Sequence, residues 1–188
     1  MTNLKIILPN TAYEKELLKI APEHDIMFTA EAKSIPLAYE MARQSGKPYI
    51  VIRKGVKVYM GNPLEVSVRS ITTQKEQKLY LDKADAELMK GKRLLIVDDV
   101  ISTGESLRAV EELVRQAGGI CCGKMAILAE GDAAKREDII TLAPLPLFNA
   151  DGSINLKGFL KIKDSIPENV ENTVLGGMAS AIITLPED

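Results

Sequence analysis

The sequence is poor in the residues that many catalytic and metal sites use, since its 188 residues include no tryptophan, one histidine and two cysteines. The cysteines, Cys121 and Cys122, are adjacent, and a disulfide between neighbouring strand residues would be strained because they point to opposite faces. One histidine and no C-x-x-C spacing argue against a Cys/His zinc site, and a Ser-His-Asp triad would need His24 as its base. His24 lies in the polar segment Pro22-Glu23-His24-Asp25, which predicts a surface position in a turn.

An excess of charge of either sign is also missing, because 24 Lys+Arg stand against 26 Asp+Glu and the formal net charge is −2. This balance argues against binding nucleic acids through bulk charge, and an aromatic content of 4% argues against a stacking platform for bases. No stretch approaches the ~20 apolar residues of a membrane helix, and no basic flank with a long apolar run marks a signal peptide. We therefore expect no nucleic-acid partner and no membrane association, with the reducing cytoplasm as the default location.

The composition that remains is that of a globular protein, with 46% apolar and 27% charged residues, and the length suits a single domain, 1–188. Apolar runs typical of strands alternate with segments at helical spacing. The predicted strands are 25–30, 48–53, 78–81, 93–97, 120–129 and 139–142, with possible strands at 160–162 and 180–185. The predicted helices are a first one that follows Thr11 and runs through Ile20, and then 35–44, 84–89 and 105–117. This alternation predicts an α/β fold with a mostly parallel central sheet flanked by helices.

One segment, residues 54–77, interrupts the alternation. It is polar, contains Gly55, Gly61 and Pro63, and includes a half-alternating run at 65–71. Such a segment predicts a long excursion from the core, part hairpin and part flexible loop.

The strongest chemical signal is the sequence Leu94-Leu95-Ile96-Val97-Asp98-Asp99-Val100-Ile101-Ser102-Thr103-Gly104-Glu105-Ser106. We expect a buried strand that ends at Val97, a loop at 98–103 and then a helix. The free N–H groups and dipole of a helix start can bind a phosphate, and a glycine and hydroxyls beside it assist. Asp98 and Asp99 would lie next to that phosphate at the carboxyl end of a parallel strand, where they could accept hydrogen bonds from two sugar hydroxyls. The alternative is an ordinary strand end and helix cap, but the apolar run before the acids and the turn directly after them favour a binding site.

At these residues the sequence resembles the type I phosphoribosyltransferases, whose signature is an apolar strand, two acids, a few residues and Thr-Gly. Residues 31–38 resemble the pyrophosphate-contacting loop of the adenine and xanthine branch, and residues 53–60 resemble the start of its flexible catalytic loop. Residues 131–136 and 144–148 resemble the end of adenine phosphoribosyltransferases. The resemblance covers about residues 25–148, so that 1–24 and 149–188 are expected to form a small hood or peripheral elements.

The resemblance implies phosphoribosyl pyrophosphate with magnesium as one substrate and a purine base as the other. Asp98 and Asp99 would hold the ribose hydroxyls, directly or through the metal, and would bind that metal directly or through water. The implied catalytic residues are Asp98, Asp99, Arg53 and Lys57. The residues implied to cradle the 5′-phosphate are Ser102, Thr103, Gly104, Glu105 and Ser106. Those implied to contact or neutralise the pyrophosphate are Ala32, Lys33, Ser34, Arg53, Lys54 and Lys57, beneath a loop at about 57–77 that closes over the site.

The implied activity is magnesium-dependent transfer of a phosphoribosyl group to a purine in purine salvage, with adenine favoured and xanthine, guanine and hypoxanthine open. The alternative is a non-catalytic regulator that senses phosphoribosyl pyrophosphate. The basic residues Arg53, Lys54 and Lys57 favour the enzyme, because a sensor does not need to clamp a leaving group. Glu105 stands where many family members have a small residue, and we expect its carboxylate to point outward. Family members commonly form dimers, so a homodimer is expected.

Overall fold

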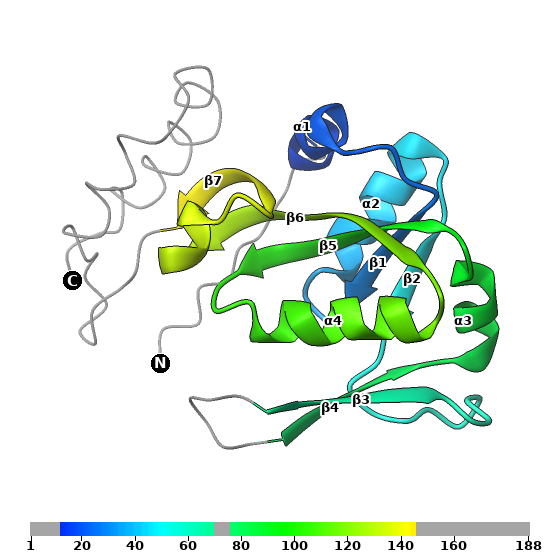
Figure 1. The fold of residues 1–188 in the computed structure, drawn as a ribbon. Coiled ribbons are helices and arrows are strands. Elements are labelled where there is room, and N and C mark those ends of the chain that lie inside the picture. Colours follow the sequence, from blue (N-terminus) through cyan, green and yellow to red (C-terminus); the bar gives the residue numbers. More distant parts are fainter. Residues whose placement is uncertain (1–11, 70–75, 146–188) are drawn as a thin grey trace, which may run out of the picture.

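The computed structural model describes residues 12–69 and 76–145 (Figure 1). The helices within these residues are α1 (Ala12–Ile20), α2 (Ile35–Ser45), α3 (Lys83–Met89), α4 (Glu105–Gln116) and the short 3-10 helix η1 (Gly131–Lys135). The strands are β1 (Ile26–Ala30), β2 (Tyr49–Ile52), β3 (Leu64–Arg69), β4 (Glu76–Leu81), β5 (Arg93–Ile101), β6 (Ile120–Glu130) and β7 (Ile140–Leu145). Each of these helices is too short or too polar to span a bilayer. Most of the predicted peripheral elements, at 1–11 and 149–188, lie outside the described residues, and so do the possible strands at 160–162 and 180–185.

The central sheet has the strand order β2-β1-β5-β6-β7. Every neighbouring pair in it is parallel, and Phe28 in β1 lies between Ile50 of β2 and Ile96 of β5. This confirms the predicted α/β fold with a mostly parallel central sheet flanked by helices. β1 and β5 are neighbours although about sixty residues separate them in sequence, so their carboxyl ends meet at one edge of the sheet (Figure 1). The ends of these two strands and the segments that directly follow them carry most of the predicted site residues.

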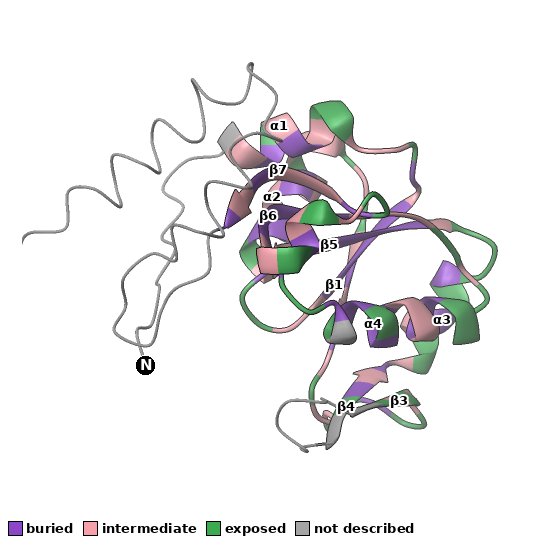
Figure 2. Ribbon diagram, turned by 60° about the vertical axis from the view of Figure 1, so that its left-hand side comes forward, coloured by how far each residue is buried: buried purple, intermediate pink, exposed green. Residues whose placement is uncertain are grey.

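Helices cover both faces of the sheet, and an apolar core lies on each side (Figures 1 and 2). Alternate residues of β5 enter the two cores, because side chains along a strand point to opposite faces. Leu94 and Ile96 pack in the core that includes α3 and α4, whereas Leu95 and Val97 pack in the core that includes α1 and α2. All four side chains are at most 3% exposed. Burying one such side chain stabilises the fold by ~1.5–3 kcal/mol, so β5 is a fixed platform for the residues after Val97.

Strand β5 is longer than the sequence predicted. Val100 and Ile101 continue the parallel pairing with Leu128 and Ala129 of β6, and the strand ends at Ile101 rather than Val97. The predicted loop at 98–103 was therefore wrong at its start, because the second apolar pair finds a neighbouring strand. Asp98 and Asp99 belong to the strand, and the turn before α4 is confined to residues 102–104.

The excursion after β2 forms the predicted hairpin. β3 and β4 pair in antiparallel fashion, with Leu64 opposite Leu81 and Ser67 opposite Lys78. The hairpin is attached to the sheet by a bridge in which Arg53 and Tyr80 exchange backbone hydrogen bonds of 2.9 and 2.8 Å. The hairpin tip at 70–75, and with it the predicted mobility of the loop, lies outside the described residues.

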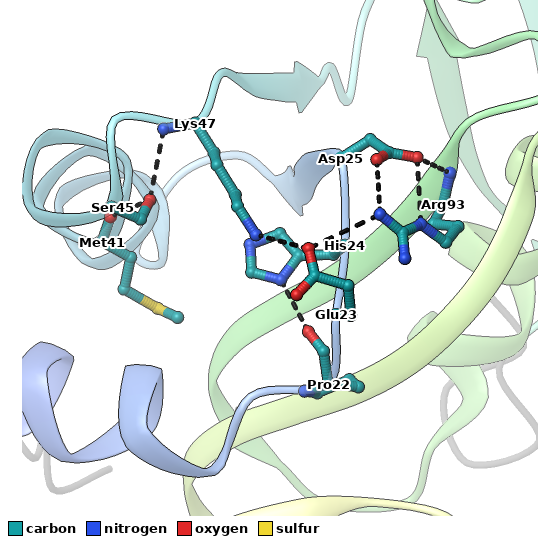
Figure 3. Close-up of polar contacts among 8 residues, drawn as sticks. All are labelled: Pro22, Glu23, His24, Asp25, Met41, Ser45, Lys47 and Arg93. Atoms are coloured by element: carbon teal, nitrogen blue, oxygen red, sulfur yellow. Dashed lines mark hydrogen bonds and ion pairs between the residues drawn. The ribbon is translucent and has the colours of Figure 1, made fainter.

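The prediction of a surface position for His24 is wrong, because the residue is only 3% exposed. Its Nδ1 lies 2.8 Å from the carbonyl oxygen of Pro22, while the carboxylates on either side of it, Glu23 and Asp25, reach outward to basic partners (Figure 3). These neighbours occupy the surface and the imidazole is turned inward. His24 precedes β1 and so lies at the amino ends of the parallel strands, at the opposite edge of the sheet from Asp98, which rules it out as a base there.

Candidate active site

An acidic pair, Asp98 and Asp99, stands near the end of β5. The backbone N–H of Asp99 donates to Oδ1 of Asp98 at 2.9 Å. The Ser34 side chain, from the loop after β1, lies close enough to the Asp98 carboxyl group to favour its charged form, so the two carboxyl ends meet. The loops predicted to contact pyrophosphate and ribose are therefore side by side.

Burial and the neighbouring Asp99 carboxylate raise the pKa of Asp98 to about 7. A cation or a hydrogen-bond donor bound beside such an acid would stabilise its ionised form, so the raised pKa is consistent with a binding site. The carboxylate pair gives oxygen ligands of the type that magnesium prefers, and magnesium commonly uses one or two carboxylates together with substrate phosphates. The residues thus fit the ion, although no group of three or more Asp, Glu, His or Cys side chains placed to hold a metal occurs among residues 12–69 and 76–145.

The predicted phosphate turn lies between β5 and α4. Ser102, Thr103 and Ser106 are exposed, whereas Gly104 is buried and forms the N-cap of α4 with a φ of 77°. Gly104 has no side chain with which to cap α4, and the N–H groups in the first turn of such a helix can bind an anion. Glu105 is the first residue of α4, and the orientation of its carboxylate stays a prediction.

Arg136 covers Gly104 and was missed as part of the site. A Cβ on Gly104 would collide with Nη1 of Arg136, so a larger residue here would have to displace this guanidinium group as well as adopt a positive φ. Asp138 holds the guanidinium in place by accepting hydrogen bonds from Nε at 2.8 Å and Nη2 at 2.7 Å. In the sequence the arginine belonged only to the segment 131–136, and no local signal links it to a glycine 32 positions earlier.

The loop after β1 divides into an exposed and a buried part. Ala32 and Lys33 are exposed at the edge of the sheet, and the peptide bond between Glu31 and Ala32 is cis. Ser34 is 2% exposed and its hydroxyl donates to the carbonyl oxygen of Ala30 at 3.0 Å. Any contact of Ser34 with a ligand would therefore come from its backbone.

The basic residues after β2 gather around a single carboxylate, Glu31. Its Oε1 accepts a hydrogen bond of 2.6 Å from the backbone N–H of Lys54 and lies 3.7 Å from Nζ of Lys57. Its Oε2 lies 3.3 Å from Nη1 of Arg53. Burial alone would raise the pKa of Glu31, but the Lys54 amide, the Arg53 guanidinium and Lys57 together lower it. Glu31 belonged to the recognised loop, but no role was predicted for it.

These parts can bind a phosphorylated sugar with a second anionic group. The helix start at Gly104 suits one phosphate, the acidic pair suits a cation or sugar hydroxyls, and the basic cluster of Arg53, Lys54 and Lys57 suits further phosphates.

Comparison with known proteins gives a family match over most of the chain. A family profile described as a phosphoribosyl transferase domain matches residues 7–143. The chain is similar to a hypoxanthine/guanine phosphoribosyltransferase of Methanococcus voltae, with 33% identity over 127 residues, covering 68% of this chain and 64% of that protein. It is also 33% identical over 111 residues to the hypoxanthine/guanine phosphoribosyltransferase of Methanocella paludicola, covering 59% of this chain and 54% of that protein. The chain thus spans a little over half to just under two thirds of the length of these curated relatives.

Solved structures share the fold at low sequence identity. The crystal structure of adenine phosphoribosyltransferase from Thermoanaerobacter pseudethanolicus superposes with a TM-score of 0.61 at 22% identity, covering 72% of this chain and 80% of that chain. At such identity the likeness establishes the fold alone.

Proposed function

The chain belongs to the phosphoribosyltransferase family, and we propose that it transfers a phosphoribosyl group from phosphoribosyl pyrophosphate to a purine base, giving a nucleoside monophosphate and pyrophosphate. The observation that carries the proposal is the meeting, at one edge of the sheet, of the Asp98-Asp99 pair, the open start of α4 and the loop after β1. A phosphate, a ribose and a pyrophosphate in one molecule match these three parts.

The chemistry accounts for the residue types. As the bond from the sugar to pyrophosphate breaks, positive charge grows on the ribose and negative charge grows on the leaving group. Magnesium, when bound, would neutralise part of that leaving-group charge. Asp98 and Asp99 would orient the ribose hydroxyls, the N–H groups at the start of α4 would hold the 5′-phosphate, and Arg53 and Lys57 would stabilise the departing pyrophosphate. No protein nucleophile is required, which is consistent with a buried His24 at the other edge of the sheet.

For the base, we now favour hypoxanthine or guanine over adenine. The adenine expectation rested on residues 131–136 and 144–148. The curated relatives at 33% identity carry the name hypoxanthine/guanine phosphoribosyltransferase, whereas the adenine enzymes among the solved structures are similar in fold alone. The base-binding hood, which we expect to decide this choice, includes segments outside the described residues.

The test is to incubate the protein with phosphoribosyl pyrophosphate, magnesium chloride and each purine in turn, and to measure released pyrophosphate and the nucleotide formed. We expect turnover with hypoxanthine and guanine, weak or absent with adenine. Turnover with adenine alone would overturn the choice of base. Tight binding of phosphoribosyl pyrophosphate with no turnover on any base would favour the alternative, a non-catalytic sensor. Gel filtration at low protein concentration tests the proposed homodimer.

A further inference from the structure

Glu31 connects the two loops that the proposed function assigns to pyrophosphate. It lies directly before Ala32 and Lys33, and its carboxylate receives the donors of Arg53, Lys54 and Lys57 from the segment after β2. The Glu31 side chain is 17% exposed, so it is held among these groups rather than in bulk water.

The two side-chain cations, Arg53 and Lys57, contact the Glu31 carboxylate, and the proposed function assigns the same two cations to pyrophosphate. We propose that Glu31 is a positioning residue that competes with pyrophosphate for Arg53 and Lys57 and thereby sets how tightly the site holds this product, an inference that rests on the proposed function. Without ligand, one carboxylate faces two side-chain cations. With ligand, the cations are divided between the carboxylate and the phosphates.

The geometry suits an exchange of partners. The contacts of Glu31 with Arg53 and Lys57, at 3.3 and 3.7 Å, are longer than a strong charge-assisted hydrogen bond, which is ~2.7–2.9 Å. The cation side chains are 30% and 41% exposed, so a ligand can reach them. The contact of 2.6 Å with the backbone of Lys54 is short and involves no side-chain cation, so it can keep Glu31 in place while the cations turn to the ligand.

Such competition has a use in the proposed reaction. The site must stabilise pyrophosphate while it leaves the sugar, and then release it. Release or loop opening limits the turnover of many enzymes, so a site with uncompensated cations would hold its product too long. A carboxylate fixed beside Arg53 and Lys57 lowers the affinity of these cations for free pyrophosphate.

The test compares pyrophosphate binding by wild type, Glu31→Gln and Glu31→Asp, measured by calorimetry with pyrophosphate and magnesium chloride. Glutamine keeps an acceptor for the Lys54 N–H but removes the charge, and we expect about tenfold tighter binding for a charge pair near the surface. Aspartate keeps the charge but withdraws it from the cations, and we expect binding about two- to threefold tighter. In turnover, Glu31→Gln should lower kcat and the KM for phosphoribosyl pyrophosphate together.

A matched control is Glu23→Gln, because Glu23 also contacts two cations, Lys47 at 3.3 Å and Arg93 at 3.5 Å, but at the other end of β1 (Figure 3). Its pyrophosphate affinity should equal that of wild type. The inference is overturned if wild type binds pyrophosphate most tightly, or if Glu31→Gln raises KM, as expected of a merely structural residue. If Glu31→Gln does not fold, the comparison of Glu31→Asp with wild type decides alone. A wild-type protein that neither binds pyrophosphate nor forms nucleotide would instead contradict the proposed function.

Discussion

The two ends of strand β1 both carry clusters of acids and bases, but the clusters are built differently. At the amino end, Asp25 accepts hydrogen bonds from the Arg93 backbone N–H at 2.8 Å and from its Nη2 and Nε at 2.8 and 3.2 Å. Glu23 lies between Lys47 and Arg93 (Figure 3). Two carboxylates thus meet two cations, and the short contacts tie β1 to β5.

At the carboxyl end, the charges are unequal and separated. The loop after β1 presents Glu31 to a surplus of basic side chains at longer distances, and β5 presents two acids of which Asp98 has a raised pKa. At the amino end, the carboxylates and cations pair with one another within the protein, as in a structural contact. The carboxyl end has unbalanced charge of both signs, which a ligand with phosphates and sugar hydroxyls would balance. Removing charge should therefore harm stability at one end and binding at the other.

The largest effect is expected from Asp98→Asn combined with Asp99→Asn. Loss of both carboxylates should lower turnover by at least ~10³-fold, the scale seen when groups aimed at the developing charge are removed. Circular dichroism should be unchanged, because neither side chain supports the apolar cores. Asp132→Asn is the control, and this variant should keep full activity because the Asp132 side chain on η1 is almost fully exposed. A double variant with near-normal turnover would remove the acids from the mechanism.

The second prediction compares two glycines with positive φ. Gly104→Ala and Gly46→Ala both place a side chain on a left-handed backbone, with φ values of 77° and 70°, and each should lose about 1–2 kcal/mol of stability. Only the Cβ at position 104 also meets Arg136, whereas the one at position 46 meets nothing within 4 Å. Calorimetry with ribose 5-phosphate should therefore show about tenfold weaker binding for Gly104→Ala and unchanged binding for Gly46→Ala. Equal affinities would mean that this turn does not hold the phosphate.

The third prediction concerns the cost of keeping Asp98. Its pKa is about 7 in the folded protein against an ordinary value of 3.8, so the folded state keeps a proton that the unfolded state loses. Stability should fall as pH rises from about 4 through 7, and Asp98→Asn should lack this fall. We compare the free energy of unfolding of Asp98→Asn with that of wild type at each pH. Between pH 4 and pH 8 this difference should shift in favour of the variant by roughly 1–2 kcal/mol, a value reduced for solvent screening at a partly exposed site. Urea unfolding of both proteins at the two pH values measures this, and a constant difference would contradict it.

The sequence was sufficient for the parts of the molecule that depend on local pattern. The apolar run from Leu94 to Val97 and the helical spacing after Gly104 predicted β5 and α4 and, with them, the place of Asp98 and Asp99. The alternation of strands and helices predicted the parallel sheet, because few connections are compatible with it. Boundaries were less secure, as the extension of β5 to Ile101 depends on pairing with β6.

The parts that escaped prediction depend on residues far apart in sequence. The convergence of Arg53 and Lys57 on Glu31 requires β1 and β2 to be neighbours in register, and the position of Arg136 over Gly104 requires β6 to lie beside β5. His24 was misjudged because polar neighbours in the sequence suggested a turn, whereas its own side chain is buried. Long-range contacts of this kind leave no periodic or motif signal in a single chain.

The smallest effect, and the one confined to the amino end, is expected from Asp25→Asn. Hydrogen bonds from the Arg93 side chain and backbone lower the pKa of Asp25 below its ordinary value of 3.8. The stability that the carboxylate contributes is therefore present above about pH 4 and is lost as the pH falls through the folded pKa. Thermal unfolding should show a lower Tm for Asp25→Asn at pH 7 and a shrinking difference below pH 4, while the turnover of the folded variant at 25 °C stays normal. A difference that does not change with pH would assign the effect to packing, and a loss of turnover would show that the two ends of β1 are coupled. Normal turnover with lowered stability, set against the opposite result for the Asp98 and Asp99 variant, would establish that the two edges of one sheet serve separate purposes.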